Sequence, residues 1–321
     1  MPSTPETGAD ARLSATDPPR KGRSSLLVPG TGWAFLGVLA FSFTLPMNRL
    51  AIEGFDPSVV GSGRSVIAGL LAAVVLLVLR VRPPRRELWV SFVVIAIGVG
   101  ITFGFLTSLA LRTESASHGA VVIALLPVAT AVIATVRGGE RPSRWFWLGS
   151  LAGTLVVLAY VLGRAGGTPS GADGLFAIAT LAAAAGYAEG GRLARTMPGW
   201  QVIAWGLVFC LPIAIPVTAI AVAVSEPADP APSSVMGLAY LAIISMFVGF
   251  VAWYRGMGEA GVARASQIQL IQPLLTVTWA ALILSEPLSW GTVLAAVSVV
   301  LCIGLTQRAR IHHAEARSPV S

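Results

Sequence analysis

Charged residues are scarce in this chain of 321 residues. Aspartate, glutamate, lysine and arginine together make up 12% of it, against about 25% in a typical soluble globular protein. Hydrophobic residues make up 55%, and the mean hydropathy is +0.77. So little charge in so apolar a chain argues against a water-soluble protein and indicates an integral membrane protein.

Histidine and cysteine are also rare, which limits the kinds of enzyme that the chain could be. Of the three histidines, His312 and His313 lie near the C-terminus and His118 stands alone near the end of an apolar segment. Cys210 and Cys302 both lie inside apolar segments, where cysteine behaves as a small apolar residue, so we expect no disulfide and no metal site. The sequence contains neither a Walker A motif nor a visible nucleophile triad. It therefore predicts no catalytic residue and no cofactor, and argues against ATP-driven transport within this chain.

Long apolar segments, by contrast, follow one another along almost the whole chain. A transmembrane helix needs about 20 apolar residues to cross about 30 Å of hydrocarbon, and ten segments have about this length. They lie near residues 31–51, 57–79, 88–110, 115–136, 145–163, 172–194, 200–224, 234–256, 262–284 and 289–306. Because unpaired backbone polar groups are not tolerated in lipid, we expect an all-α integral membrane protein of ten transmembrane helices.

The basic residues predict how these helices are oriented. If the N-terminus is cytoplasmic, 18 of the 22 lysines and arginines fall in cytoplasmic tails and loops or at the cytoplasmic helix ends, as the positive-inside rule requires. The net charge of +7 then reports topology and not a nucleic-acid partner. We expect a multi-pass protein of the inner membrane with both termini in the cytoplasm. Residues 1–28 would be a disordered cytoplasmic tail and residues 307–321 a second cytoplasmic tail.

One stretch of the sequence occurs twice, and the two copies have opposite loop charge. The connection after the first copy is rich in arginine and the connection after the second is not, so the two copies should face opposite sides of the membrane. We therefore predict two inverted five-helix repeats, residues 31–163 and 172–306, an arrangement found in secondary transporters. A shift of 146 residues aligns Pro127 with Pro273, Thr130 with Thr276, Glu140 with Glu286 and Ser143 with Ser289.

Several short motifs in the two copies are similar in order and spacing to those of a known family. The first half contains the phenylalanine-rich stretch FSFTLPMNRLA, then Pro57 and Arg64, and then SLALRTESASHGAVVIALLPV, which runs on to Glu140. The second half contains YLAIISMFVGFVAWYRGMGEAGVARASQIQLIQPLLTVTWAALILSEPLSWG. On these stretches the chain resembles the EamA-type transporters of the drug/metabolite transporter superfamily. The resemblance implies a ten-helix carrier with a central cavity that transports small metabolites or drugs, often outward.

Two prolines of the repeat predict where helices bend. Pro127 and Pro273 each lie about 11 to 12 residues into their segments, roughly 17 Å from one end and so near the middle of the membrane. Proline removes one backbone hydrogen bond and clashes with the preceding turn, so we expect a bend at each. The bends could take part in alternating access, or they could only shape static kinks. Glu140 and Glu286, at the loop boundaries, are expected to stabilise local turns.

The ninth segment contains a stripe of uncharged polar residues. Gln269, Gln272 and Thr276 have the spacing of one helical face. Amides offer donors and acceptors without the cost of a buried charge, so we expect them to line a substrate cavity. The alternative is interhelical hydrogen bonding, worth about 0.6 kcal/mol on average in membrane proteins. The equivalent positions of the first copy hold Ile123, Leu126 and Thr130.

Arg64 is the most deeply placed charge, about 10 Å from the outer end of the second segment. A charge inside the membrane is costly and usually faces a cavity or a partner. It could attract a carboxylate or a phosphate of the substrate, or it could pair with Glu53, Asp56 or Glu114.

Glu189 is a second intramembrane charge, and it lies three residues before Arg192. An ion pair between the two is the simpler interpretation, and proton exchange during transport is the alternative. Aromatic and polar residues near the segment ends could also line the cavity, although aromatic residues there more often form the belt at the membrane interface. These further candidates are Asn48, Tyr160, Tyr187, Trp253 and Tyr254.

Together these features favour a secondary transporter that works by alternating access and exports small organic metabolites or drugs. We expect it to act in the lipid bilayer as a monomer or homodimer. The alternatives are an integral membrane enzyme acting on a lipid-soluble substrate and a passive channel.

Overall fold

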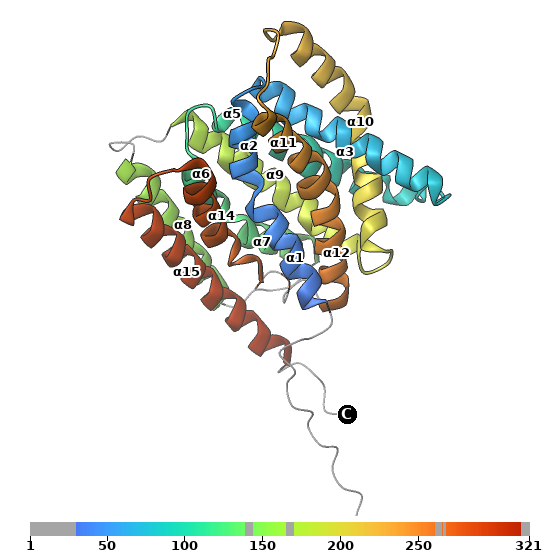
Figure 1. The fold of residues 1–321 in the computed structure, drawn as a ribbon. Coiled ribbons are helices and arrows are strands. Elements are labelled where there is room, and N and C mark those ends of the chain that lie inside the picture. The colour runs from blue at the N-terminus through green and yellow to red at the C-terminus, as the bar shows by residue number, and fades with distance from the viewer. Residues whose placement is uncertain (1–29, 139–143, 165–169, 261–264, 266–267, 316–321) are drawn as a thin grey trace, which may run out of the picture.

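The structure is a computed structural model in which residues 30–138, 144–164, 170–260, 265 and 268–315 are described (Figure 1). Within these residues every regular element is a helix. Seven helical segments are long and apolar enough to cross a membrane, and three shorter apolar helices complete the set of ten. The prediction of an all-α, ten-helix membrane protein is confirmed. The tail predicted for residues 1–28 lies outside the described residues.

The helices follow the predicted segments in order, and several segments are built from more than one piece. The first half contains α1 (Thr31–Ser42), α2 (Thr44–Ile52), α3 (Pro57–Val78), the short η1 (Arg86–Leu88), α4 (Trp89–Ile95), the π-helix η2 (Ala96–Thr102), α5 (Phe103–Ala110), α6 (Ala116–Ile123), α7 (Leu126–Gly138) and α8 (Arg144–Arg164). The second half contains α9 (Gly171–Leu193), α10 (Gly199–Val224), α11 (Pro232–Ala239), the π-helix η3 (Tyr240–Val248), α12 (Gly249–Ala260), α14 (Gln272–Leu284) and α15 (Trp290–Glu315). The last helix therefore continues past residue 306, where we had expected a tail to begin.

Side-chain caps mark where three of these helices begin. Asp56 accepts a hydrogen bond from the Ser58 backbone at the start of α3, and Ser115 does the same for the start of α6. Ser170 and Asp173 form a reciprocal capping box at the start of α9. Such caps satisfy backbone N–H groups that have no partner within the helix.

The duplication is visible in the backbone as well as in the sequence. The π-helix of the first half ends at Thr102 and that of the second half at Val248, which are 146 residues apart. The helices that follow the two central breaks begin at Leu126 and Gln272, again 146 residues apart. The same irregularities thus occur at matching positions of the two inverted five-helix repeats.

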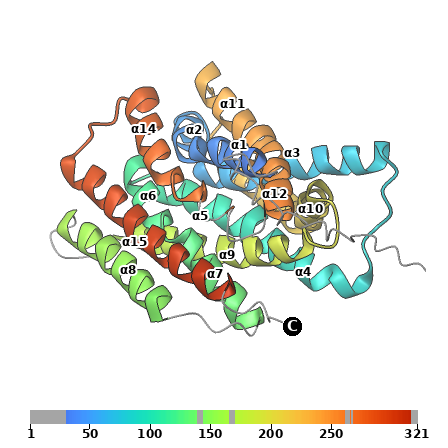
Figure 2. The same ribbon diagram turned by 90° about the horizontal axis from the view of Figure 1, so that it is seen from below.

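The two repeats are interlocked, because most helices pack against the opposite half. Helices α8 and α15 run side by side along one edge of the molecule, and α3 packs on α10 at the far side (Figures 1 and 2). Helix α1 packs on α12, and α9 packs on the segment formed by α4, η2 and α5. The first helix of each repeat thus packs against the third segment of the other.

Small residues allow these close contacts. Gly98 in η2 lies directly against the backbone carbonyl of Ala182 in α9. A Cβ added to Gly37 in α1 would lie only 2.9 Å from the backbone nitrogen of Trp253 in α12. Close backbone approach of this kind is how helices associate in lipid, where the hydrophobic effect gives little driving force between them.

Candidate functional site

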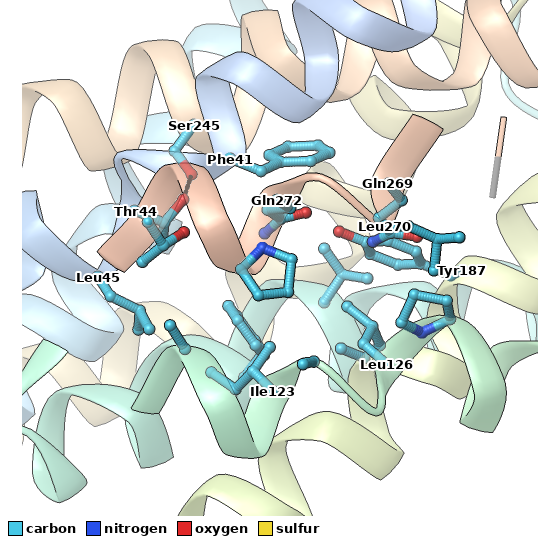
Figure 3. Close-up of a pocket in the computed structure, with 18 of the residues that line it drawn as sticks. Phe41, Thr44, Leu45, Ile123, Leu126, Tyr187, Ser245, Gln269, Leu270 and Gln272 are labelled. Atoms are coloured by element: carbon cyan, nitrogen blue, oxygen red, sulfur yellow. Dashed lines mark hydrogen bonds between the residues drawn. The ribbon is translucent and has the colours of Figure 1, made fainter. Parts of the chain in front are cut away.

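A narrow cavity lies between the two repeats, with a volume of about 50 Å³ that is open to a water-sized sphere (Figure 3). Side chains from both halves line it, and most of them are apolar. They come from α1, α2, α3, η2, α5, α6, α7, α9, η3, α12, α14, α15 and the two central breaks.

The lining itself follows the repeat. Many lining residues of the first half have a lining partner 146 positions later, so the pseudo-twofold axis that relates the repeats passes through the cavity. The pairs are Phe41 and Tyr187, Val99 and Ser245, Ile123 and Gln269, Ala124 and Leu270, Leu126 and Gln272, and Pro127 and Pro273.

Two broken helices form the centre of the cavity wall. The helix breaks at residues 124–125 in the first repeat and 270–271 in the second, and Pro127 and Pro273 are each the second residue of the helix that follows. Proline has no backbone N–H, so the carbonyls of Ile123 and Gln269 receive no hydrogen bond from the residue four positions on. Irregular backbone of this kind is tolerated at membrane depth where it lines a cavity or is buried in protein. The structure places both prolines where the sequence predicted a bend, and their part in any motion stays a prediction.

The polar stripe of the ninth segment faces this cavity. Gln269, Gln272 and Thr276 all line it, and Gln269 and Thr276 are each only 3% exposed. In the described part of the chain, Oε1 of Gln272 is buried without a hydrogen-bond partner. Figure 3 shows Gln272 between the hydrogen-bonded pair Thr44 and Ser245, whose hydroxyls are 2.7 Å apart, and Gln269. Gln272 thus offers an acceptor to a bound solute.

Aromatic rings form another wall of the cavity. Phe41, Tyr187 and Phe250 line it, and the rings of Phe41 and Phe250 lie 4.7 Å apart. Trp253 and Tyr254 lie behind this wall, almost fully buried, with ring centroids 6.2 Å from Phe41 and 5.5 Å from Phe250 respectively. The structure therefore places these two predicted lining residues in a supporting layer, where they pack against residues that do line the cavity.

Two further predicted residues lie away from the lining. Asn48 is fully buried, and its Oδ1 accepts a hydrogen bond from Ser108 at 3.0 Å. Glu189 forms the expected pair with Arg192, at 3.0 Å from Nη2, and the same nitrogen donates to Ser91. The pair accounts for the position of Glu189, and its exchange of a proton remains a prediction.

Arg64 lines the cavity as a buried cation. It is 3% exposed, and Nε has no acceptor. Within the described residues no carboxylate lies within ion-pair distance of it, so the alternative pairs with Glu53, Asp56 or Glu114 are not formed. Its guanidinium lies 5.9 Å from the centre of the Phe103 ring.

A polar network that was not predicted from the sequence joins the two repeats. It lies at the end of the bundle that is expected to face the outside of the cell. Glu286 was expected to stabilise a local turn, but its carboxylate instead accepts hydrogen bonds from the backbones of Ala116 and Ser117, at 2.8 and 3.0 Å, and from the Ser117 hydroxyl at 2.6 Å. His118, which stood alone in the sequence, lies 2.6 Å from Asp173. Both contacts join the first repeat to the second. The only hint in the sequence was Ser115. Serine often precedes the first turn of a helix, where the backbone N–H groups have no partner within the helix.

A third link between the repeats lies beside this network. The ring of Tyr160 in α8 lies 5.4 Å from that of His118, and its hydroxyl lies 3.1 Å from that of Thr292 in α15. Of the predicted lining residues, Tyr160 is thus placed between the paired outer helices and not at the cavity. Glu140, the first-repeat counterpart of Glu286, lies outside the described residues.

Comparison with known proteins identifies both halves. Residues 28–162 and residues 171–307 each match the family described as "EamA-like transporter family". The chain is 40% identical over 279 residues to the "Uncharacterized transporter YdeK" of Bacillus subtilis (strain 168), an alignment that covers 86% of this chain and 97% of that relative. It also resembles a solved structure described as "Crystal structure of protein", with a TM-score of 0.62 and 19% sequence identity over 90% of this chain and 99% of that one. At this identity the last likeness shows the fold alone.

Proposed function

The chain belongs to the EamA-like transporter family, as its motifs predicted, and on this premise we propose that it is a secondary carrier that moves a small organic solute across the inner membrane by alternating access. The observation that carries the proposal is the position of the cavity on the pseudo-twofold axis of two inverted repeats, between two broken helices. Substrate sites of secondary transporters commonly have this position. A site formed by both repeats can be exposed to either side as one repeat moves against the other.

The outer polar network supplies the contacts that such a movement has to break. Glu286 of the second repeat holds the first turn of α6 in the first repeat, and His118 of α6 meets Asp173 of α9. While these contacts hold, the ends of α6, α9 and α14 are tied together beside the cavity. We therefore assign this end of the bundle to the gate that opens outward.

Orientation and direction belong to the same proposal. The concentration of arginine in the loops at the opposite end supports cytoplasmic termini. The resemblance to the drug/metabolite transporters supports export, in a monomer or a homodimer.

A proteoliposome assay with the purified protein tests the carrier function. A carrier shows saturable uptake that is accelerated by unlabelled solute on the opposite side, whereas a channel shows no such counterflow and an enzyme converts the compound. A panel of labelled organic solutes should therefore give counterflow for at least one compound. Linear, unsaturable flux would instead favour the channel, and chemical conversion the enzyme.

The role of the ninth segment can be tested in the same assay by exchanging its amides for the residues of the first repeat. Gln272→Leu and Gln269→Ile remove hydrogen bonds of about 1.4 kcal/mol to the solute, which corresponds to a tenfold rise in the half-saturation concentration. Gln201→Leu, on α10 and away from the lining, is the matched control and should leave the half-saturation concentration unchanged. Unaltered transport in both cavity variants would remove these two residues from the site.

A further inference from the structure

We infer that the transported solute is an organic monocarboxylate with an apolar or aromatic body, and that Arg64 binds its carboxylate. The inference deepens the proposed carrier function and rests on it. It begins from a buried cation at the cavity wall without an anionic partner among the described residues. A charge inside the membrane is costly, and such residues usually pair with another group or face the path of a substrate.

The protein holds the guanidinium in a defined niche. The guanidinium lies against the backbone of Gly104 in α5, where an added Cβ would lie 2.5 Å from both Nε and Nη2. The ring of the neighbouring Phe103 covers it at 5.9 Å. Gly61, one turn earlier on α3, allows the approach, because a Cβ there would lie 2.6 Å from the Cα of Phe105. The niche fits a side chain that stays at the cavity wall and does not reach to the membrane surface.

The repeat shows that this charge is not required by the fold. The position 146 residues after Arg64 is Cys210, which is fully buried and packs against Gly100, where an added Cβ would lie 3.0 Å from its sulfur. One repeat thus fills this place with a small apolar side chain. The other carries a cation there, beside the cavity.

Charge balance selects the kind of solute. Among the described residues that line the cavity, Arg64 is the one with a full charge and none is acidic. A monoanion brings the net charge of the occupied cavity to zero, whereas a cation is repelled and a dianion leaves an excess charge in a desolvated space. Guanidinium and carboxylate also match in geometry, since two parallel N–H donors meet two oxygens. The apolar body is accommodated by Phe41, Tyr187 and Phe250.

Three probes that share a ring and a chain length but differ in charge test the inference: 3-phenylpropanoate, 3-phenylpropylamine and 3-phenylpropan-1-ol. Binding is measured by calorimetry on the full chain in nanodiscs, with empty nanodiscs subtracted. We expect the carboxylate to bind at least tenfold more tightly than the alcohol, and the amine more weakly than either. Equal binding of the three, or preference for the amine, overturns the inference. A 3-phenylpropylphosphonate probe that bound tenfold more tightly than the carboxylate would overturn the assignment of a carboxylate.

Substitutions then assign the preference to one residue. Arg64→Gln should reduce the ratio between carboxylate and alcohol affinity to less than threefold, while Arg64→Lys, which keeps the charge, should retain part of it. Arg112→Gln removes an exposed arginine outside the cavity and should retain all of it. An unchanged ratio in Arg64→Gln refutes the role of Arg64. The ranking of the three probes on the unaltered protein tests the charge preference independently of any variant.

Flux separates this inference from the proposed function. Carboxylate-selective binding without counterflow of 3-phenylpropanoate would support the site and count against the carrier. Counterflow of solutes without regard to charge would support the carrier and overturn the inference.

Discussion

Glu286 offers the sharpest test of how the two repeats are held together. It lies just after α14, and its carboxylate meets the first turn of α6, where it accepts hydrogen bonds from the backbones of Ala116 and Ser117 and from the Ser117 hydroxyl. Glu286→Gln keeps the shape of the side chain but removes the negative charge. The variant should therefore weaken the link between the repeats without leaving a void.

The size of the effect follows from these contacts. A negative charge near a helix N-terminus stabilises by about 0.3 to 2 kcal/mol. A hydrogen bond to a charged group contributes about 1.5 to 3 kcal/mol, against about 0.5 to 1.5 kcal/mol for a neutral one. The glutamine amide also turns an NH₂ group toward backbone donors. We therefore expect the contact to stabilise the link between the repeats by about 2 kcal/mol less than it does with glutamate. If the contact exists only while the outer end is closed, the population of outward-open molecules rises about thirtyfold, because 1.4 kcal/mol corresponds to a factor of ten.

Labelling of a cysteine in the cavity measures this population. Leu45→Cys places a thiol in the lining, in a background where Cys210 and Cys302 are replaced by alanine. In intact cells a membrane-impermeant maleimide should then react at least tenfold faster when Glu286 is replaced by glutamine. Glu226→Gln, an exposed glutamate in the loop between α10 and α11, is the matched control and should leave the rate unchanged. Equal rates in both variants would refute the assignment of Glu286 to the closed outer end.

Two further predictions concern packing and coupling. Gly256→Ala should lower the free energy of unfolding by about 1 to 3 kcal/mol, because the added Cβ would lie 2.7 Å from the Cα of Ala34 at the contact between α1 and α12. Thermal unfolding measures this change. Gly32→Ala is the control, since nothing lies within 4 Å of a Cβ there. An unshifted unfolding midpoint in Gly256→Ala would contradict the close packing. If Glu189 exchanges a proton during transport, Glu189→Gln should abolish the dependence of flux on pH, whereas Glu259→Gln, in an exposed pair on α12, should keep it. A Glu189 variant as responsive to pH as the parent ends the proton hypothesis.

The sequence predicts those parts of the fold that depend on local properties. The ten helices could be placed because a membrane span needs about 20 apolar residues in a row. The breaks before Pro127 and Pro273 could be predicted because proline acts on its own turn. The interruption between α1 and α2 at Phe43 also lies within reach of a proline, since Pro46 leaves the Ser42 carbonyl without a donor four residues on. What the sequence does not report is that the Phe43 ring stacks on Trp279 of α14 at 4.5 Å. That contact joins residues far apart in the chain, which no local pattern reports.

The same distinction applies to the site. Gln269 and Gln272 were predicted as lining residues from helical spacing, and both do face the cavity, although the helix breaks between them at residues 270–271. The partners of Glu286 could not be predicted, because they are backbone N–H donors about 170 residues away in the chain. Trp253 was predicted to line the cavity from its residue type, but the structure places it one layer behind, where only the packing of whole helices decides its position.

The two repeats share a backbone pattern but differ in chemistry, and the difference has a direct consequence for a bound solute. Both halves break at the same repeat position, which alternating access requires if each half is to bend in turn. The side chains beside the breaks do not have to match, and they differ: the first repeat presents Ile123 and Leu126 where the second presents Gln269 and Gln272. Beside the breaks, a solute on the pseudo-twofold axis therefore meets apolar side chains of the first repeat and amides of the second. A symmetric cavity would bind it equally well in two orientations, whereas this one favours a single orientation, with its carboxylate at Arg64 of the first repeat and its other hydrogen-bonding groups at Gln269 and Gln272 of the second.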